Sequence, residues 1–273
     1  MAPAADGQPV PFLPGTPKPW FIRGFGKYTL RLVKKRFFAM RLAREHAGAM
    51  DDLAAREGPA IVVLNHCSWW DPLTALVLQR LYMPDRPSAA PMDYDQLKRF
   101  GFFKHIGIFG VDPQNRASLD AMGAYVQDLI AQDPRATLWV TPQGEFADIR
   151  DPIKLRPGTA AIAARTPGVR VLSVAVEYGF WVEQKPEVFL RFQPVEVESE
   201  TPSTTDWHRA LTADMRENAD ALAAHVRSRD PDRFSIIHGK GAAQTNPVYD
   251  LYLRLTGRAG SIQAKRRDET ATL

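Results

Sequence analysis

A histidine and an aspartate, His66 and Asp71, stand five positions apart in the stretch NHCSWWDPL. His66 follows an apolar run, and Asp71-Pro72 is a typical helix start, with the aspartate as N-cap and the proline at the first helical position. A tight loop between the strand and the helix would bring the imidazole to the carboxylate. A carboxylate in that place fixes the imidazole tautomer and stabilises the imidazolium that forms when the ring accepts a proton. The pair therefore has the chemistry needed to activate a hydroxyl group.

Other kinds of site receive less support from the residues around this pair. A metal site of His66, Cys67 and Asp71 lacks further clustered ligands, because the other histidines are scattered singly, and we expect no metal. Cys67 is interpreted as a packing residue, since neighbours in a strand-like segment point to opposite sides. Trp69 and Trp70 either line an acyl groove or belong to the core. The sequence contains no Walker loop, G-x-S-x-G elbow, H-E-x-x-H pair or dinucleotide fingerprint.

Short apolar runs and helical patterns alternate on both sides of the pair. We expect strands at residues 60–65, 88–92, 107–111, 137–141, 169–179 and 187–197. We expect helices at residues 72–82, 94–106, 118–131, 158–165 and 205–227. This order predicts an α/β fold with a central, largely parallel mixed sheet flanked by helices. Active sites of such sheets form at the carboxyl ends of the strands, where the loops carrying His66 and Gly144 begin.

The chain of 273 residues, with 45% hydrophobic and 24% charged residues, fits one domain with appendages. A single cysteine excludes an internal disulfide framework. We expect four segments along the chain. They are a Pro-rich N-terminal segment (1–19), a basic amphipathic helical segment (20–57), the α/β domain (58–228), and a C-terminal extension (229–273) with a helix at PVYDLYLRL and a polar tail.

The amphipathic segment near the N-terminus is strongly basic, because no acidic residue lies between Gly7 and Arg44. Aromatic side chains are interleaved with the cations, a pattern that favours a helix lying in an anionic membrane interface. The alternative is a helix packed on the domain with a solvated basic face. The residues expected to contact lipid are Trp20, Phe21, Arg23, Phe25, Lys27, Arg31, Lys34 and Lys35.

Localisation follows from the same segment and from what the sequence lacks. No run approaches the roughly 18–20 apolar residues that span a bilayer, and the N-terminus does not read as a secretory signal. We therefore expect a cytoplasmic protein, peripheral on the inner face of the membrane, with membrane lipids as partners at the interface. A single basic arm without a recognisable module is weak support for nucleic-acid binding, and we expect no nucleic-acid partner.

The stretch NHCSWWDPL resembles the first motif of the glycerolipid acyltransferase superfamily, of the lysophosphatidate (1-acyl-glycerol-3-phosphate) acyltransferase type. GIFGVDPQNRAS, VTPQGEFAD and VRVLSVAVEY resemble its second, third and fourth blocks, and KLRPGTAAIA its basic-x-Gly helix start. The resemblance covers roughly residues 58–195. It implies that His66 is the general base and that Asp71 orients it. The substrate-binding candidates in and around these blocks are Asn65, Arg116, Gln143, Gly144, Glu145 and Arg156.

The second and third blocks diverge from the family pattern where cations are usual. Pro113 replaces an arginine, PQGEF replaces Pro-Glu-Gly-Thr-Arg, and a common lysine is missing near Asp93. A phosphate gains charge-assisted bonds from guanidinium groups, which Arg116 and Arg156 restore only in part. Glu145 would repel a dianion. We therefore expect the acceptor hydroxyl on a neutral lipid, a glycolipid or a glycosylated terpenoid; a lysophosphatidate-type phospholipid acceptor is the alternative.

The predicted reaction moves a fatty acyl group from acyl-CoA or acyl carrier protein (acyl-ACP) to that hydroxyl. The thioester is a co-substrate, and no bound cofactor is expected. Backbone N–H groups around Gly144 are candidate donors to the oxyanion. Two other classes stay open: an acyl thioester hydrolase, in which the same pair activates water, and a non-catalytic lipid-binding protein.

Overall fold

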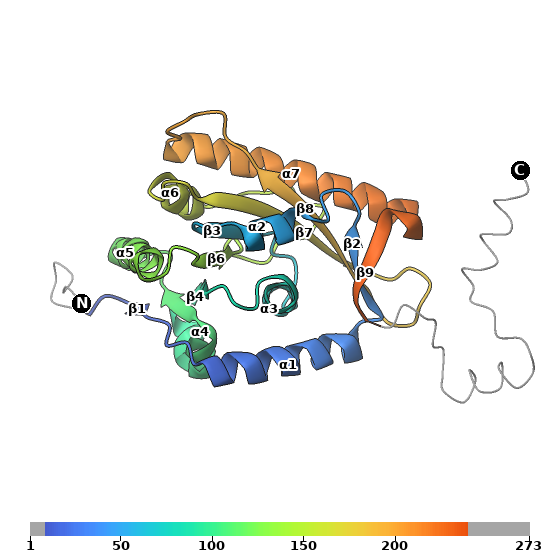
Figure 1. Ribbon diagram of the computed structural model, residues 1–273, viewed down its shortest axis with the longest axis horizontal. Helices are drawn as coiled ribbons and strands as arrows, with labels where there is room; N and C mark the ends of the chain where they lie inside the picture. The colour runs from blue at the N-terminus through green and yellow to red at the C-terminus, as the bar shows by residue number, and fades with distance from the viewer. Residues whose placement is uncertain (1–8, 240–273) are drawn as a thin grey trace, which may run out of the picture.

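The computed structural model describes residues 9–239 of the chain (Figure 1). The helix expected at PVYDLYLRL and the polar tail after it lie outside the described residues, as do residues 1–8. The described strands form one mixed sheet of nine strands in the order β1-β5-β4-β6-β3-β7-β8-β2-β9. Their bounds are β1 (Phe12–Leu13), β2 (Ala39–Ala43), β3 (Ala60–Leu64), β4 (Ser88–Asp93), β5 (Ile108–Val111), β6 (Thr137–Val140), β7 (Arg170–Gly179), β8 (Glu187–Val195) and β9 (Phe234–Gly239).

The centre of the sheet is parallel and its margins are mixed. Strands β5, β4, β6, β3 and β7 all run in one direction. The pairs β7–β8, β2–β9 and β1–β5 are antiparallel, whereas β2 and β8 are parallel. The expected α/β fold with a largely parallel mixed sheet is therefore confirmed.

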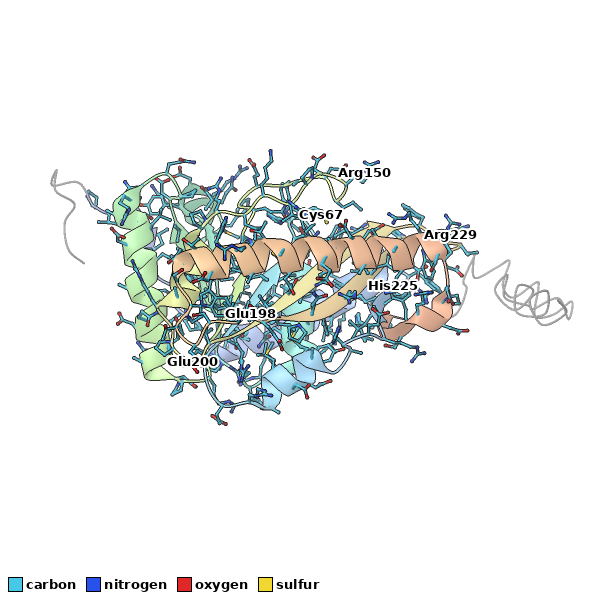
Figure 2. The ribbon with its side chains drawn as sticks, turned by 90° about the horizontal axis from the view of Figure 1, so that it is seen from above. Cys67, Arg150, Glu198, Glu200, His225 and Arg229 are labelled. Atoms are coloured by element: carbon cyan, nitrogen blue, oxygen red, sulfur yellow. The ribbon has the colours of Figure 1, made fainter. Side chains whose placement is uncertain are left out.

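Helices cover both faces of this sheet. They are α1 (Pro19–Arg36), α2 (Ala49–Ala55), α3 (Asp71–Tyr82), α4 (Tyr94–Arg99), α5 (Arg116–Gln132), α6 (Gly158–Ala164) and α7 (Thr204–Ser228), with two 3-10 turns, η1 (Gly101–Ile106) and η2 (Pro231–Arg233). One face is covered by α1, α2 and α3, and the other by α5, α6 and α7 (Figure 1). Helix α7 runs along the sheet when the molecule is seen from above (Figure 2).

Strand β3, which carries the site, is buried from both sides. Ile61 and Val63 pack in the core cluster shared with α5, α6 and α7. Val62 and Leu64 pack in the cluster shared with α1, α2 and α3. Because successive side chains of a strand point to opposite faces, a strand covered on both sides is apolar at every position. This explains the continuous apolar run AIVVL.

The helical segment expected at residues 20–57 is corrected by the structure. It begins as helix α1, but residues 39–43 form β2, which pairs with β8 and β9 inside the sheet. Every residue of β2 is buried, including Arg41, so its sequence has no alternation of buried and exposed positions that would identify a strand. Strand β9 lies within the expected C-terminal extension, and β1 lies within the expected Pro-rich segment. The expected helix at 94–106 divides at Gly101 into α4 and η1.

Helix α1 packs on the domain through a narrow inner face. Its buried residues are Gly26, Thr29 and Val33, and a Cβ on Gly26 would lie 3.5 Å from the Cδ of Arg80 on α3. The basic side chains of α1 are exposed on the opposite side. The structure therefore has a helix packed on the domain with its basic face in solvent, and membrane contact remains a prediction for that face. Within residues 9–239, no helix has the length and apolar character to cross a membrane.

A buried arginine holds the beginning of β3 in place. The Arg86 guanidinium donates to the carbonyl oxygens of Leu53, Arg56 and Gly58, at 3.3, 2.7 and 2.8 Å. It also donates to the hydroxyl of Thr137 on β6, at 3.0 Å. These bonds join the end of α2 and the start of β3 to the neighbouring strand.

Replacing Arg86 with methionine removes all these donors and leaves buried carbonyl groups unpaired. We expect the free energy of unfolding to fall by about 2–4 kcal/mol, measured by urea denaturation. Arg116→Met is the matched control, since the Arg116 side chain is 85% exposed and pairs with Asp120 on the surface. Its effect should stay within about 0.5 kcal/mol. Equal losses in both variants would contradict the role given to Arg86.

Candidate active site

The loop after β3 begins with a side chain that extends the sheet. Asn65 is buried, donates to the carbonyl oxygen of Val176 at 2.9 Å and accepts from the same residue's N–H at 2.7 Å. Its amide thus continues the pairing of β3 with β7 by one further step. These two bonds set the direction in which the chain leaves β3. Asn65 is therefore a positioning residue for His66.

The expected pair forms at this point. The Nδ1 atom of His66 lies 2.8 Å from Oδ2 of Asp71. Asp71 is fully buried, and its Oδ2 also accepts from the backbone N–H groups of Cys67 and Ser68, each at 2.8 Å. Asp71 is the first residue of α3 and Trp70 is the N-cap, so the expected N-cap role of Asp71 is wrong. Its carboxylate binds the loop before the helix, and the loop folds around it.

The hydrogen bonds of Asp71 also determine the form of the imidazole. A carboxylate that receives several donors is an acceptor toward His66, so Nδ1 is the donor in this bond, and Nε2 is the nitrogen that carries the lone pair in the neutral ring. The His66 side chain is 17% exposed, which gives this nitrogen access to solvent or substrate. The arrangement can therefore take a proton from a hydroxyl group or from water.

Tyr178, near the end of β7, completes the surroundings of Asp71. Its hydroxyl donates to Oδ1 at 2.8 Å and lies 3.1 Å from the hydroxyl of Thr74 on α3. Burial, followed by the nearby Asp71, holds the pKa of Tyr178 well above its ordinary value, so the phenol stays protonated. Sequence reasoning missed this residue. The available signal was a tyrosine near the end of a buried strand that runs parallel to the strand before His66.

Cys67 lies beside the same carboxylate and is not a ready nucleophile. Its Sγ is 3.8 Å from Oδ1 of Asp71 and 3.7 Å from the carbonyl oxygen of Val176. Burial and then the charge of Asp71 raise the pKa of the Cys67 thiol above its usual value. A protonated thiol is a weak nucleophile, which fits the packing role expected from the sequence.

The loop after β6, which carries the third block, is bonded directly to the loop after β3. Gln143 is buried, and its Oε1 accepts from the N–H of His66 at 2.7 Å. Further along, the N–H of Ala147 donates to the carbonyl oxygen of His66 at 2.8 Å. Two expected site residues, His66 and Gln143, are thereby brought together. The side chain of Gln143 contacts the backbone N–H of His66 and not its imidazole ring.

Gly144 permits the turn in the third block. Its φ is +73°, and a Cβ there would lie 2.6 Å from Nε of Arg156, so the guanidinium stem of Arg156 packs over the glycine. The N–H of Gly144 donates to the carbonyl oxygen of Thr141 at 3.1 Å. That N–H is therefore already engaged, and the oxyanion donor expected at Gly144 itself is not free. Gly144 and Arg156 are therefore adjacent in the structure, and their role in substrate binding stays a prediction.

Phe146 is the second residue that sequence reasoning missed. Its ring centroid lies 4.3 Å from the His66 imidazole, with an angle of 39° between the planes, and the residue is 60% exposed. The preceding Glu145 is also exposed on this loop. An apolar ring therefore lies beside the imidazole, at the position where the third block of the resembled family commonly has arginine.

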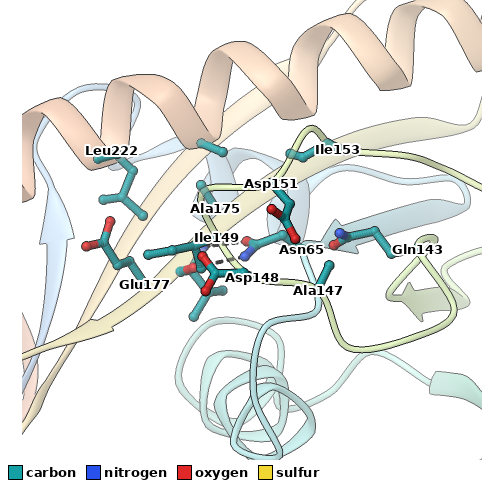
Figure 3. Close-up of a pocket in the computed structure, with 13 residues that line it drawn as sticks. Asn65, Gln143, Ala147, Asp148, Ile149, Asp151, Ile153, Ala175, Glu177 and Leu222 are labelled. Atoms are coloured by element: carbon teal, nitrogen blue, oxygen red, sulfur yellow. Dashed lines mark hydrogen bonds between the residues drawn. The ribbon is translucent and has the colours of Figure 1, made fainter.

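A small pocket lies beside these two loops (Figure 3). Asn65 and Gln143 line it together with the loop before α6, strand β7 and helix α7. Its acidic lining residues include Asp148, Asp151 and Glu177, and burial raises the pKa of Glu177. His66 is not among the residues that line this pocket.

Arg116 is not brought to the pair. It opens α5 at the surface and bonds to Asp120 on its own helix, and no contact among the described residues links it to His66. Over residues 9–239, no group of three or more His, Cys, Asp or Glu side chains is placed to hold a metal ion.

Comparisons with known proteins find one matching family model. The family model described as Acyltransferase matches residues 47–177, which include both loops of the site. This segment is therefore similar to the acyltransferase family, as the sequence blocks predicted, and the match supports acyl transfer as the class of activity.

Among solved structures, a crystal structure of the 1-acyl-sn-glycerophosphate (LPA) acyltransferase PlsC from Thermotoga maritima is similar to the chain. The identity is 17%, the TM-score is 0.49, and the match covers 74% of this chain and 80% of that one. The search of curated proteins finds no match.

Tyr178→Phe keeps the ring and removes the donor to Asp71. The carboxylate then directs more of its negative charge to His66 and stabilises the protonated ring, so a base that must be neutral is active only at higher pH. We expect kcat/KM to fall about tenfold near neutral pH, with the acidic limb of its pH profile displaced to higher pH. Steady-state acyl transfer measured across pH tests this.

Thr74→Val is the matched control, because it contacts the same hydroxyl without touching Asp71. Its profile should keep the wild-type midpoint. A uniform loss of activity in Tyr178→Phe, with an unchanged profile, would argue for a merely structural role.

Proposed function

We propose that the protein transfers a fatty acyl group from an acyl thioester, on CoA or acyl carrier protein, to a hydroxyl of a lipid-like acceptor, with His66 as general base. The observation that carries the proposal is the His66–Asp71 pair at the carboxyl end of β3, with Nε2 left free. The match to the acyltransferase family model supports acyl transfer, and the geometry supports this pair as the group that moves the proton.

In the proposed reaction, Nε2 of His66 takes the hydroxyl proton while the hydroxyl oxygen bonds to the thioester carbonyl carbon. The tetrahedral intermediate then collapses, the C–S bond breaks, and the proton on Nε2 passes to the leaving thiolate, giving an ester and a free thiol. General base catalysis of this kind contributes about 10²–10⁴-fold. Asp71 holds the ring and stabilises its protonated form without taking the proton.

The developing oxyanion needs donors close to the imidazole. The N–H groups of Glu145 and Phe146 follow Gly144 in the same loop and have no protein acceptor among the described residues. They are therefore the candidate donors, in place of Gly144 itself. No covalent acyl-enzyme is required, which agrees with a half-buried Cys67 whose thiol pKa is raised.

The acceptor is proposed to be neutral at its head, such as a neutral lipid, a glycolipid or a glycosylated terpenoid. Neither Phe146 beside the imidazole nor the exposed Glu145 has a cationic group that could bind a phosphate dianion. Arg156, which is half-buried against Gly144, is the cation packed on this turn. A lysophosphatidate acceptor is the second candidate, and the match to the family model is equally compatible with it.

The site of action is proposed to be the cytoplasmic surface of a membrane. The outer side of α1 presents Arg23, Lys27 and Arg31 together with exposed Trp20 and Tyr28, a combination suited to anionic headgroups. Phe21 and Phe25, also expected to contact lipid, are half-buried against η1, with the Phe25 and Phe103 rings 6.0 Å apart. Lys34 and Lys35 lie exposed in the last turn of α1.

His66→Ala removes the proposed base. We expect acyl transfer from labelled acyl-CoA to fall by about 10²–10⁴-fold, with the circular dichroism spectrum unchanged, because His66 is partly exposed and its loss empties little of the core. His208→Ala, on α7, is the matched control and should retain activity. Wild-type activity in His66→Ala would refute the base assignment.

The same assay separates the other classes. Free fatty acid as the main product in every tested alcohol would identify a hydrolase. Tight thioester or lipid binding without any product would identify a binding protein.

Phe146→Arg introduces a guanidinium beside the imidazole. Because arginine forms charge-assisted bonds with phosphate, we expect the ratio of kcat/KM for lysophosphatidate over monoacylglycerol to rise by about tenfold or more. Phe146→Leu, which stays apolar, should leave this ratio unchanged. The neutral-acceptor proposal fails if the wild-type protein already prefers lysophosphatidate clearly, and the acyltransferase assignment would stand in that case.

A further inference from the structure

A second group of exposed aromatic residues lies outside the segment expected to contact lipid. Phe100 is 39% exposed and Phe102 is 45% exposed, at the junction of α4 and η1. The neighbouring Phe103 is half-buried and holds this junction in place, with its ring centroid 4.2 Å from that of Phe102. Two large apolar rings are thus presented to solvent on a short, well-anchored turn.

This turn is attached to the beginning of α1. The Phe25 ring lies 6.2 Å from that of Phe102, and the N–H of Lys18 donates to the carbonyl oxygen of His105 at 3.0 Å. Trp20 and Tyr28 on α1 are themselves 65% and 55% exposed. Figure 1 shows α4 beside the N-terminal end of α1. We call Trp20, Tyr28, Phe100 and Phe102 the aromatic dock.

The charges around the aromatic dock are mostly positive. Lys98 and Arg99 precede Phe100, are exposed, and have no ion pair among the described residues. They stack on aromatic neighbours, Lys98 at 5.4 Å from the ring centre of Tyr94 and Arg99 at 5.2 Å from that of Phe100. The acidic side chains of α4 lie at the other end of that helix, at its N-cap and in its first turn; they are Asp93 and Asp95.

We propose that the α4–η1 junction is a second membrane-binding element, which inserts Phe100 and Phe102 into an anionic bilayer surface beside α1. This deepens the membrane location proposed above and rests on it. Segments with exposed aromatic rings flanked by unpaired cations partition into the headgroup region of a bilayer. There the rings lose contact with water and the cations bind lipid phosphates. Neither a second copy of the chain nor a protein partner is needed to explain both features.

Two membrane-binding elements fix the orientation of the protein on a bilayer better than a single element does. A lone helix on a bilayer can roll about its axis, whereas a helix joined to a separate inserted turn cannot. The aromatic dock sits at the N-terminal part of α1, and the other end of α1 leads to Phe37, whose ring lies 4.9 Å from that of Trp70 in the loop of the site. Binding through the dock would therefore hold the bilayer along α1 and set the orientation of the His66 loop toward it.

The test is vesicle flotation of the full chain with phosphatidylcholine vesicles and with phosphatidylcholine mixed with phosphatidylglycerol. The double variant Phe100→Ser/Phe102→Ser should reduce the partition coefficient on mixed vesicles by about tenfold or more. Lys98→Gln/Arg99→Gln should weaken binding to mixed vesicles and leave binding to phosphatidylcholine unchanged. Thermal unfolding of each variant shows that the fold is retained, since all four side chains are exposed.

Ile236→Thr is the matched control. Ile236 is 41% exposed and pairs with Arg41, whose guanidinium stacks on Trp181 at the α7 side of the sheet. Its binding to vesicles should equal that of the wild type. Unchanged vesicle binding in the phenylalanine double variant overturns the inference. So does a variant that binds vesicles like the wild type but has lost self-association, measured by gel filtration.

The failure of this inference is distinguishable from that of the proposed reaction. Acyl transfer in detergent micelles, where no bilayer must be bound, should be equal in the wild type and in Phe100→Ser/Phe102→Ser. A wild type without transfer activity refutes the reaction, whereas unchanged flotation of the variant refutes the membrane element alone.

Discussion

The buried carboxylate of Asp71 is the group on which the rest of the site depends. Its side chain has no exposed surface, and a negative charge in that place is strongly unfavourable unless donors surround it. The donors come from the imidazole of His66, from two backbone N–H groups of the following loop, and from the hydroxyl of Tyr178. The loop conformation, the start of α3 and the orientation of the imidazole all follow from the need to solvate this one charge.

Those donors meet only because β3 and β7 keep their register. Leu64 pairs with Val174, and the amide of Asn65 then binds both backbone groups of Val176. Tyr178 follows two residues later and so lies on the same face of β7 as Val176, toward α3. A slip of one residue would turn the tyrosine to the opposite face and leave Oδ1 of Asp71 without its donor. Register is therefore a condition for the chemistry as well as for packing.

The sequence predicted those features of the fold and of the site that depend on residues close together in the chain. The alternation of strands and helices, the end of β3 and the meeting of His66 with Asp71 each depend on a short stretch of sequence. The missed features depend on residues distant in sequence. Strand β2 is buried along its whole length, Arg41 included, and Phe146 meets His66 because two loops are bonded to each other. Likewise, the N–H of Gly144 is occupied by a turn that only the folded backbone reveals.

The same tyrosine joins the site to α1. Phe37, the C-cap of α1, has its ring 5.7 Å from that of Tyr178, whose hydroxyl binds Asp71. Helix α1 is held on α3 through its small inner residues, and α3 begins at Asp71. Both contacts are made by packed, buried groups, which resist deformation. A surface bound along the outer side of α1 would thus be held at a fixed distance from the imidazole, which is the geometry that an enzyme needs when its acceptor remains in the bilayer during the reaction.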